Sequence, residues 1–120
     1  MEPNTELKSF VDKINQEIAA EIESQLNNLE TFIANSSFNT EQIESLRKFT
    51  SDEKTTLNSR IKFLIDRHEQ QIADYEKIKI EMNSKRKIAW KLNQSLETLL
   101  HSELHLFKRN IAGFILMLIA

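Results

Sequence analysis

Apolar residues recur at steps of three and four along most of this chain, and polar residues fill the positions between them. This is the period of a helix that buries one face. The first such run extends from Leu7 to Ile33. Polar residues just before it can cap the start of a helix, so the pattern predicts a helix over about residues 5–34.

A cluster of turn-forming residues, Asn-Ser-Ser-Phe-Asn, follows this run at residues 35–39. Such residues favour loops because their short side chains hydrogen-bond to the neighbouring backbone. The sequence therefore predicts a loop over 35–39, with Phe38 packed against the core. A short helix over residues 40–49 is expected next, after a weak capping signal in which Gln42 follows Asn39 at a distance of three residues.

Thr50 and Glu53 form the stronger capping signal, because a Ser/Thr followed three residues later by Glu can satisfy two free N–H groups at a helix start. Neither glycine nor proline occurs between Thr50 and Ala112. The apolar stripe continues through most of that stretch. We therefore expect one long helix over about residues 51–112.

Five polar or basic residues, 83–87, interrupt the stripe of this expected long helix. One alternative is a kink there, with two arms of about thirty residues that fold onto the first helix as a small bundle. We favour continuity because the five residues include neither glycine nor proline. A continuous rod of some sixty residues would be about 90 Å long, so other chains would have to cover part of its apolar face.

The apolar stripe is widest in the second half of the long helix. We expect this half to bind partner helices by burying its apolar side chains against them. The predicted partner contacts are Leu92, Leu96, Leu99, Leu100, Leu104, Phe107, Ile111, Ile115 and Leu118.

Residues 111–120 form an almost wholly apolar tail, preceded by Lys108 and Arg109. A helix needs about 20 apolar residues to cross a bilayer, and this run is shorter. Three interpretations stay open: a tail buried inside a complex, shallow membrane insertion through residues 104–120, or the beginning of a span that is cut short.

The composition supports an all-α protein. The chain has 120 residues, of which 40% are hydrophobic and 28% charged, and it has one glycine, one proline and no cysteine. Sheets need turns rich in glycine and proline, so this composition argues against strands. We expect a single elongated subunit, either a coiled coil or an elongated helical bundle, with a short helix between two long helical segments. The acidic amino terminus does not resemble a secretory or mitochondrial targeting segment, so we expect an intracellular protein in the cytoplasm or at the face of a membrane.

Charge is distributed unevenly along the chain. Residues 1–53 carry four Lys/Arg and eleven Asp/Glu, a net charge of −7, whereas residues 54–120 carry twelve and seven, a net charge of +5. An acidic first helix could therefore lie antiparallel along the basic middle of the long helix or of an equivalent helix in another subunit.

One cluster combines basic side chains with an aromatic one: Lys77, Lys79, Lys85, Arg86, Lys87, Trp90 and Lys91. Such clusters can bind the phosphates of nucleic acids or lipids. The sequence pI of about 5.9 is not typical of a nucleic-acid-binding protein. We therefore favour an acidic partner helix and expect no nucleic acid.

Histidines supply the only candidate metal ligands. His101 and His105 lie four residues apart, on one face of a helix, but the glutamate spacing of known two-histidine sites is missing. His68 lies on the apolar stripe, where a core histidine could make assembly sensitive to pH. Phosphate-binding loops and nucleophile motifs are also missing, so we expect no catalytic residue, metal or cofactor.

The sequence therefore predicts a non-catalytic scaffolding subunit of a larger helical assembly, in which hetero-oligomers are favoured over homo-oligomers. The alternative is a membrane-associated subunit that is anchored or docked through its apolar carboxy terminus, residues 104–120.

Overall fold

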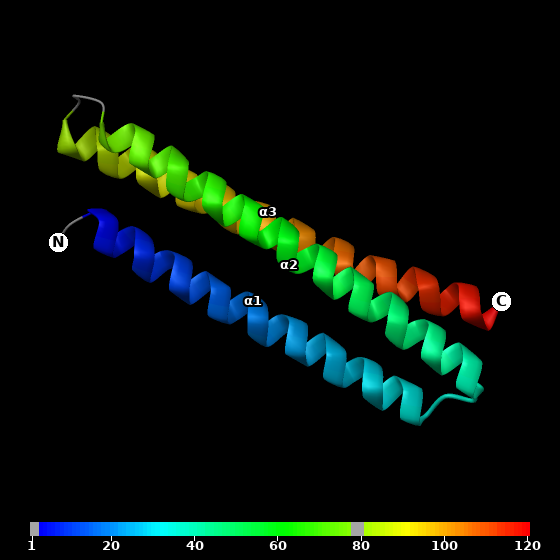
Figure 1. Ribbon diagram of the computed structural model, residues 1–120. Helices are drawn as coiled ribbons and strands as arrows, with labels where there is room; N and C mark the ends of the chain where they lie inside the picture. Colours follow the sequence, from blue (N-terminus) through cyan, green and yellow to red (C-terminus); the bar gives the residue numbers. More distant parts are fainter. Residues whose placement is uncertain (1–2, 78–80) are drawn as a thin grey trace.

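The part of the chain that the structure describes folds into three long helices that run up, down and up beside one another (Figure 1). Helix α1 spans Pro3–Ala34, α2 spans Thr40–Glu76 and α3 spans Met82–Ile119. The computed structural model describes residues 3–77 and 81–120, without the side chains of residues 3–8. Lys79 of the basic cluster lies outside the described residues. The prediction of an all-α, elongated helical bundle is confirmed.

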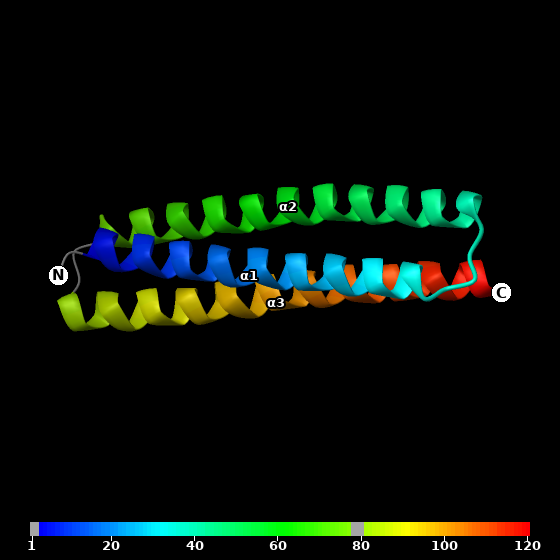
Figure 2. The same ribbon diagram turned by 90° about the horizontal axis from the view of Figure 1, so that it is seen from below.

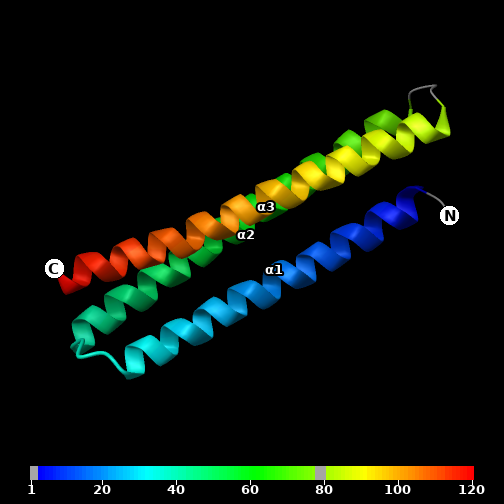
Figure 3. The same cartoon turned by 180° about the vertical axis from the view of Figure 1, so that it is seen from behind.

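The bundle is a rod, with extents of 62 × 20 × 16 Å and a radius of gyration of 18.7 Å. A compact chain of this length would have a radius of gyration of about 14 Å. Figures 2 and 3 show that α1 begins at the end of the rod where α2 ends and α3 begins, and that the carboxy terminus lies beside the α1–α2 loop. Helices α2 and α3 are the most closely packed pair, and α1 lies along them.

A continuous apolar core runs along the axis of the rod, and all three helices contribute to it. Its buried residues are Val11, Ile14, Ile18, Ile22, Leu29, Ile33, Leu46, Leu57, Ile61, Ile65, Leu96, Leu100, Leu104, Phe107 and Ile111. Their spacing in each helix follows the helical period, so each helix places one stripe in the core. The chain thus buries its main stripes without help from another molecule.

The expected continuous helix over residues 51–112 is wrong. Helix α2 ends at Glu76, and α3 begins at Met82, just before the predicted kink at residues 83–87. The alternative of two arms folded with the first helix describes the structure better. Folding back is favourable because it brings Leu100 and its neighbours in α3 against α1 and α2, whereas a straight rod would leave that stripe in water.

The sequence between α2 and α3 contains neither glycine nor proline. Glu81 is extended, with φ −59° and ψ 145°, and directly precedes α3. The Nζ atom of Lys85 donates a hydrogen bond to the backbone oxygen of Glu76 at 2.8 Å. This bond satisfies a carbonyl group in the last turn of α2, which has no partner within the helix.

Helix α2 also begins at a different place from the one predicted. The weaker of the two capping signals, at Asn39 and Gln42, forms the cap of α2. Gln42 N donates to Asn39 Oδ1 at 2.8 Å, and Asn39 N donates to Gln42 Oε1 at 2.9 Å. Thr50 is buried inside the helix, where its hydroxyl donates to the backbone oxygen of Leu46 at 2.8 Å. The separate short helix over 40–49 is therefore wrong, because Leu46 and Leu57 continue one buried stripe past Thr50.

Aromatic residues gather at the end of the bundle that holds the α1–α2 loop. The rings of Phe49 and Phe114 stack with centroids 4.3 Å apart, and those of Phe32 and Phe38 meet edge to face at 5.8 Å. Phe38 also packs against the core, as predicted. Helix α1 and the loop at 35–39 lie where the sequence places them.

The acidic helix α1 is antiparallel to α2 but parallel to α3, which carries most of the basic cluster (Figure 1). The expected antiparallel pairing with that cluster is therefore wrong within this chain. Helix α1 makes ion pairs elsewhere: Glu30 with Arg47 of α2 at 2.9 Å, and Glu21 with Lys108 of α3 at 3.4 Å. Both pairs are largely exposed, so solvent screens them and neither adds much to stability.

Candidate functional site

The predicted partner contacts on α3 separate into two groups in the structure. Five of them lie in the core of the chain itself: Leu96, Leu100, Leu104, Phe107 and Ile111. Leu92, Ile115 and Leu118 are partly buried, and Leu99 has 46% of its surface exposed. The five core residues already contact α1 and α2, so a partner could reach them only if the bundle opened.

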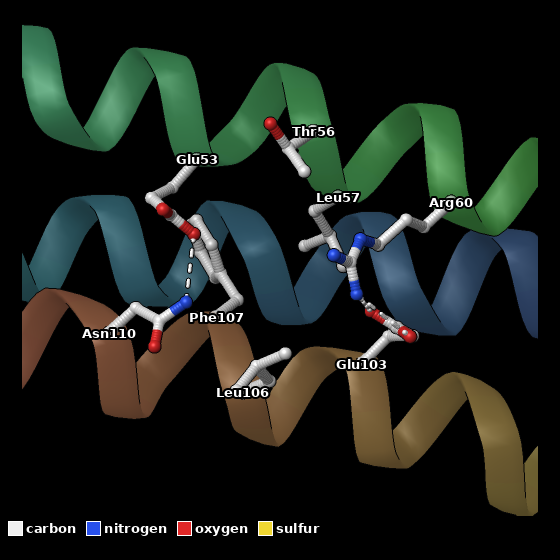
Figure 4. A pocket seen from close by; sticks show the side chains of 8 residues that line it. All are labelled: Glu53, Thr56, Leu57, Arg60, Glu103, Leu106, Phe107 and Asn110. Atoms are coloured by element: carbon white, nitrogen blue, oxygen red, sulfur yellow. Dashed lines mark hydrogen bonds and ion pairs between the residues drawn. The ribbon is translucent and has the colours of Figure 1, made fainter.

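The face of α2 and α3 that is turned away from α1 presents a shallow groove. One hollow in it, of about 90 Å³, lies between Thr56 and Arg60 of α2 and Leu106 and Asn110 of α3. In Figure 4 Arg60 reaches Glu103 and Glu53 meets Asn110 across the groove, while α1 passes behind them. A second hollow, of about 140 Å³, lies further along and includes Leu64, Arg67, Gln71, Leu92, Ser95 and Leu99 in its lining. None of the residues that line these two hollows belongs to α1.

An exposed apolar row borders the groove on α3. Leu92, Leu99 and Leu106 follow one another at intervals of seven residues, which places them on one side of the helix. Leu106 has 38% of its surface exposed. Phe63 of α2 has 64% exposed and lies three residues after Arg60 and four before Arg67, so helix geometry places it beside these two groove residues. The groove therefore offers apolar side chains to solvent along several helical turns.

Two polar contacts cross the groove and hold its acidic residues. Arg60 Nη1 lies 3.3 Å from Glu103 Oε2, and Asn110 Nδ2 donates to Glu53 Oε2 at 3.2 Å (Figure 4). Arg60 and Glu103 lie at one edge of the first hollow, between it and the second. These contacts leave both carboxylates with a partner.

His68 lies buried at the base of the second hollow. Its Nε2 atom is 2.8 Å from Asn93 Oδ1, and its ring lies 6.3 Å from that of Phe10. Burial lowers the pKa of His68 below the ordinary value of 6.5, while the hydrogen bond to Asn93 and the charge of Glu69 oppose this shift. His68 is thus a hydrogen-bonded core residue that favours its neutral form.

No protein-family model, curated protein sequence or solved structure matches this chain. What the site can do therefore follows from its own residues.

The other candidate residues do not form a chemical site. His101 Nε2 lies 3.8 Å from Glu97 Oε1, and His105 is exposed. Among the described residues, no group of three histidine, cysteine or acidic side chains is placed to hold a metal ion. In the basic cluster, Trp90, Arg86 and Lys87 are exposed at the end where α3 begins.

The carboxy-terminal tail is helical almost to its end and forms an apolar tip. Leu116, Met117 and Ile119 are exposed, whereas Phe114, Ile115 and Leu118 pack against the core. None of the described helices has a stretch that is both long enough and apolar enough to cross a membrane. The tip lies at the opposite end of the rod from the basic cluster (Figure 2).

Of the residues that line the two hollows, the predicted partner contacts include Leu92, Leu96, Leu99 and Phe107. The other residues of the groove were not predicted. Leu106 could have been found from the repeat of seven residues. Phe63 and Arg67 could not, because their position beside α3 depends on the reversal of the chain between α2 and α3.

Proposed function

We propose that this protein is a non-catalytic subunit of a helical assembly and binds an amphipathic helix of a partner protein in the groove between α2 and α3. The observation that carries this proposal is the exposure of Leu99, Leu106 and Phe63 on the one face of the α2–α3 pair that α1 leaves uncovered. A fourth helix in that position would complete a four-helix bundle, a common way for helices to cover such a face.

The exposed apolar surface of Leu99, Leu106 and Phe63 limits the expected binding affinity. Complete burial of a large apolar side chain contributes about 1.5–3 kcal/mol, and these three side chains are already about half covered. Together they supply about 2–4 kcal/mol of gross binding free energy. Micromolar binding needs about 8 kcal/mol net of ordering costs, so the hollows and the polar rim must add the remainder. We therefore expect micromolar affinity rather than nanomolar affinity.

A displayed library of helical peptides tests this proposal. Each peptide has one apolar face and randomised flanking positions, and the library is selected against the full chain. Recovered peptides are then titrated against the wild type and against a groove variant, Leu99→Ser with Leu106→Ser. We expect micromolar dissociation constants for the wild type and at least a tenfold loss in the groove variant. Circular dichroism must show that the variant remains helical and folded.

A tip variant, Leu116→Ser with Ile119→Ser, is the matched control, because it removes the same kind of exposed apolar surface from another part of α3. Helix binding should survive in this variant. If no peptide is recovered whose binding depends on Leu99 and Leu106, the groove is not a docking site for a helix.

The second candidate function is membrane association, and the exposed tip favours it. Leu116, Met117 and Ile119 project from the end of the rod, with Lys108 and Arg109 about two turns earlier, where basic residues can meet lipid headgroups. Flotation with liposomes distinguishes the two functions. If the tip binds membranes, the tip variant should lose flotation and the groove variant should keep it. Deleting residues 108–120 would be less informative, because it also removes the buried Ile111.

A further inference from the structure

The charged residues of the groove differ in whether they already have a partner. Both acidic side chains that line the first hollow already have partners, since Glu103 pairs with Arg60 and Glu53 accepts a hydrogen bond from Asn110. A cationic partner would have to compete with these contacts. The acidic residues of the groove are therefore poorly placed to attract a basic helix.

Apart from Arg60, three cations beside the groove make no ion pair with another described residue. Arg67 lines the second hollow from α2. On α3, Lys91 precedes Leu92, and Arg109 follows Leu106 by three residues, so both lie on the solvent side of the apolar row. Within the described part of the chain, none of these three side chains makes an ion pair.

The two cations of α3 also set a length. Lys91 and Arg109 are eighteen residues apart, which corresponds to about 27 Å along a helix. A bound helix that meets both of them must therefore have about eighteen residues or more. Arg67 lies across the groove from this rim, so it would meet the other flank of the same helix.

We propose that the helix bound in the α2–α3 groove carries acidic residues along its flanks, which meet Lys91 and Arg109 on one side and Arg67 on the other. This inference rests on the proposed function and adds the chemistry of the partner. The apolar face of the partner covers Leu99, Leu106 and Phe63, while its carboxylates pair with the three unpaired cations.

A second copy of this chain fits the groove less well. In a symmetric dimer the same surface faces itself, so each groove would meet the same three unpaired cations and the same engaged carboxylates. Like charges at an interface disfavour association. Charge complementarity therefore favours a different protein with an acidic amphipathic helix.

The test uses two synthetic helical peptides of about twenty residues with the same apolar face. One has glutamate at all flanking positions and the other has lysine. Fluorescence anisotropy measures their binding to the full chain at low and at high salt. We expect the acidic peptide to bind about tenfold more tightly at low salt, because three exposed ion pairs each contribute a small amount. This preference should shrink as salt screens the charges.

Charge-reversal variants test whether the three cations beside the groove cause the preference for the acidic peptide. In the variant Arg67→Glu, Lys91→Glu, Arg109→Glu we expect the preference to invert. A matched control, Lys13→Glu, Lys48→Glu, Lys62→Glu, makes the same change in net charge at exposed positions outside the groove. This control should largely keep the preference for the acidic peptide.

The outcomes separate this inference from the proposed function. Equal binding of both peptides, or equal effects of the two triple variants, would overturn the acidic partner and leave helix docking intact. Failure of both peptides to bind would count against helix docking itself. Self-association in sedimentation experiments that is lost on Leu99→Ser with Leu106→Ser would identify a second copy as the occupant and would also overturn the inference.

Discussion

Leu99 and Leu100 offer the sharpest test of the fold, because they are neighbours with the same side chain in different surroundings. Leu100 is fully buried, with 0% of its surface exposed, whereas Leu99 has 46% exposed. Truncating each to alanine removes the same atoms. The difference between the two variants therefore measures only what surrounds the side chain.

The magnitudes follow from the burial of each residue. Leu→Ala removes the equivalent of three methylene groups, about 2.4 kcal/mol of transfer free energy when all of it is buried. At Leu100 a cavity also remains, which raises the expected loss of stability to about 3–5 kcal/mol. At Leu99 about half of the transfer term applies, so we expect about 1 kcal/mol. A domain of this size has a total stability of about 6–15 kcal/mol, so Leu100→Ala removes a large part of it.

Urea denaturation followed by far-UV circular dichroism measures both values. Thermal unfolding provides a second readout, in which 1 kcal/mol corresponds to about 4 °C for a domain of this size. We expect a decrease in Tm of about 12–20 °C for Leu100→Ala and of about 4 °C for Leu99→Ala. Both transitions should be independent of protein concentration, because the core of the bundle belongs to one chain.

Two results would refute this reasoning. Losses within about 1 kcal/mol of each other would mean that α3 does not present Leu100 to the core and Leu99 to solvent. A strong dependence of the Leu100→Ala transition on protein concentration would mean that the stripe of α3 is buried between chains, as the continuous rod would require.

Two further predictions concern the helix start and the buried histidine. Asn39→Ala should lower the free energy of unfolding by about 1 kcal/mol, because it removes the cap of α2. Thr50→Val should change it by less than about 0.5 kcal/mol, because the Thr50 hydroxyl only bonds back to its own helix. Chemical denaturation of both variants measures these values, and a larger loss at Thr50 than at Asn39 would contradict the assignment of the cap. The pKa of His68 is lower in the folded protein than in the unfolded chain, where a histidine has a pKa of about 6.5. Between these two pKa values the unfolded chain binds more protons than the folded protein. The free energy of unfolding should therefore decrease as the pH falls through 6.5 and level off below the pKa of His68 in the folded protein. In His68→Gln this part of the pH dependence should disappear, and its persistence in denaturation curves at several pH values would exclude His68 as the source.

Local pattern was enough to predict the class of the fold, the first helix and the loop. The period of three and four residues depends only on helix geometry, and the cluster of turn formers at residues 35–39 is a local signal. The same local signals were misleading at Thr50, where a capping sequence lies inside a helix. A cap forms only where the chain enters a helix, and packing of Leu46 and Leu57 on one stripe kept the helix intact.

The candidate site depends much more on tertiary structure. Repeats along α3 indicate that Leu92, Leu99 and Leu106 share one side of a helix, but they cannot show whether that side meets another part of the same chain. Phe63 and Arg67 join the groove only because α2 and α3 lie antiparallel and closely packed.

By itself, the sequence of this protein determined that it is helical, where its first helix lies and which positions on each helix are apolar, because each of these properties depends on residues a few positions apart. Only the tertiary structure decided that the chain reverses after Glu76, that Leu100 is covered and that Leu99 is not. These outcomes depend on contacts between residues far apart in the chain, and the free energy of burying a whole stripe outweighs the small local preference to continue a helix.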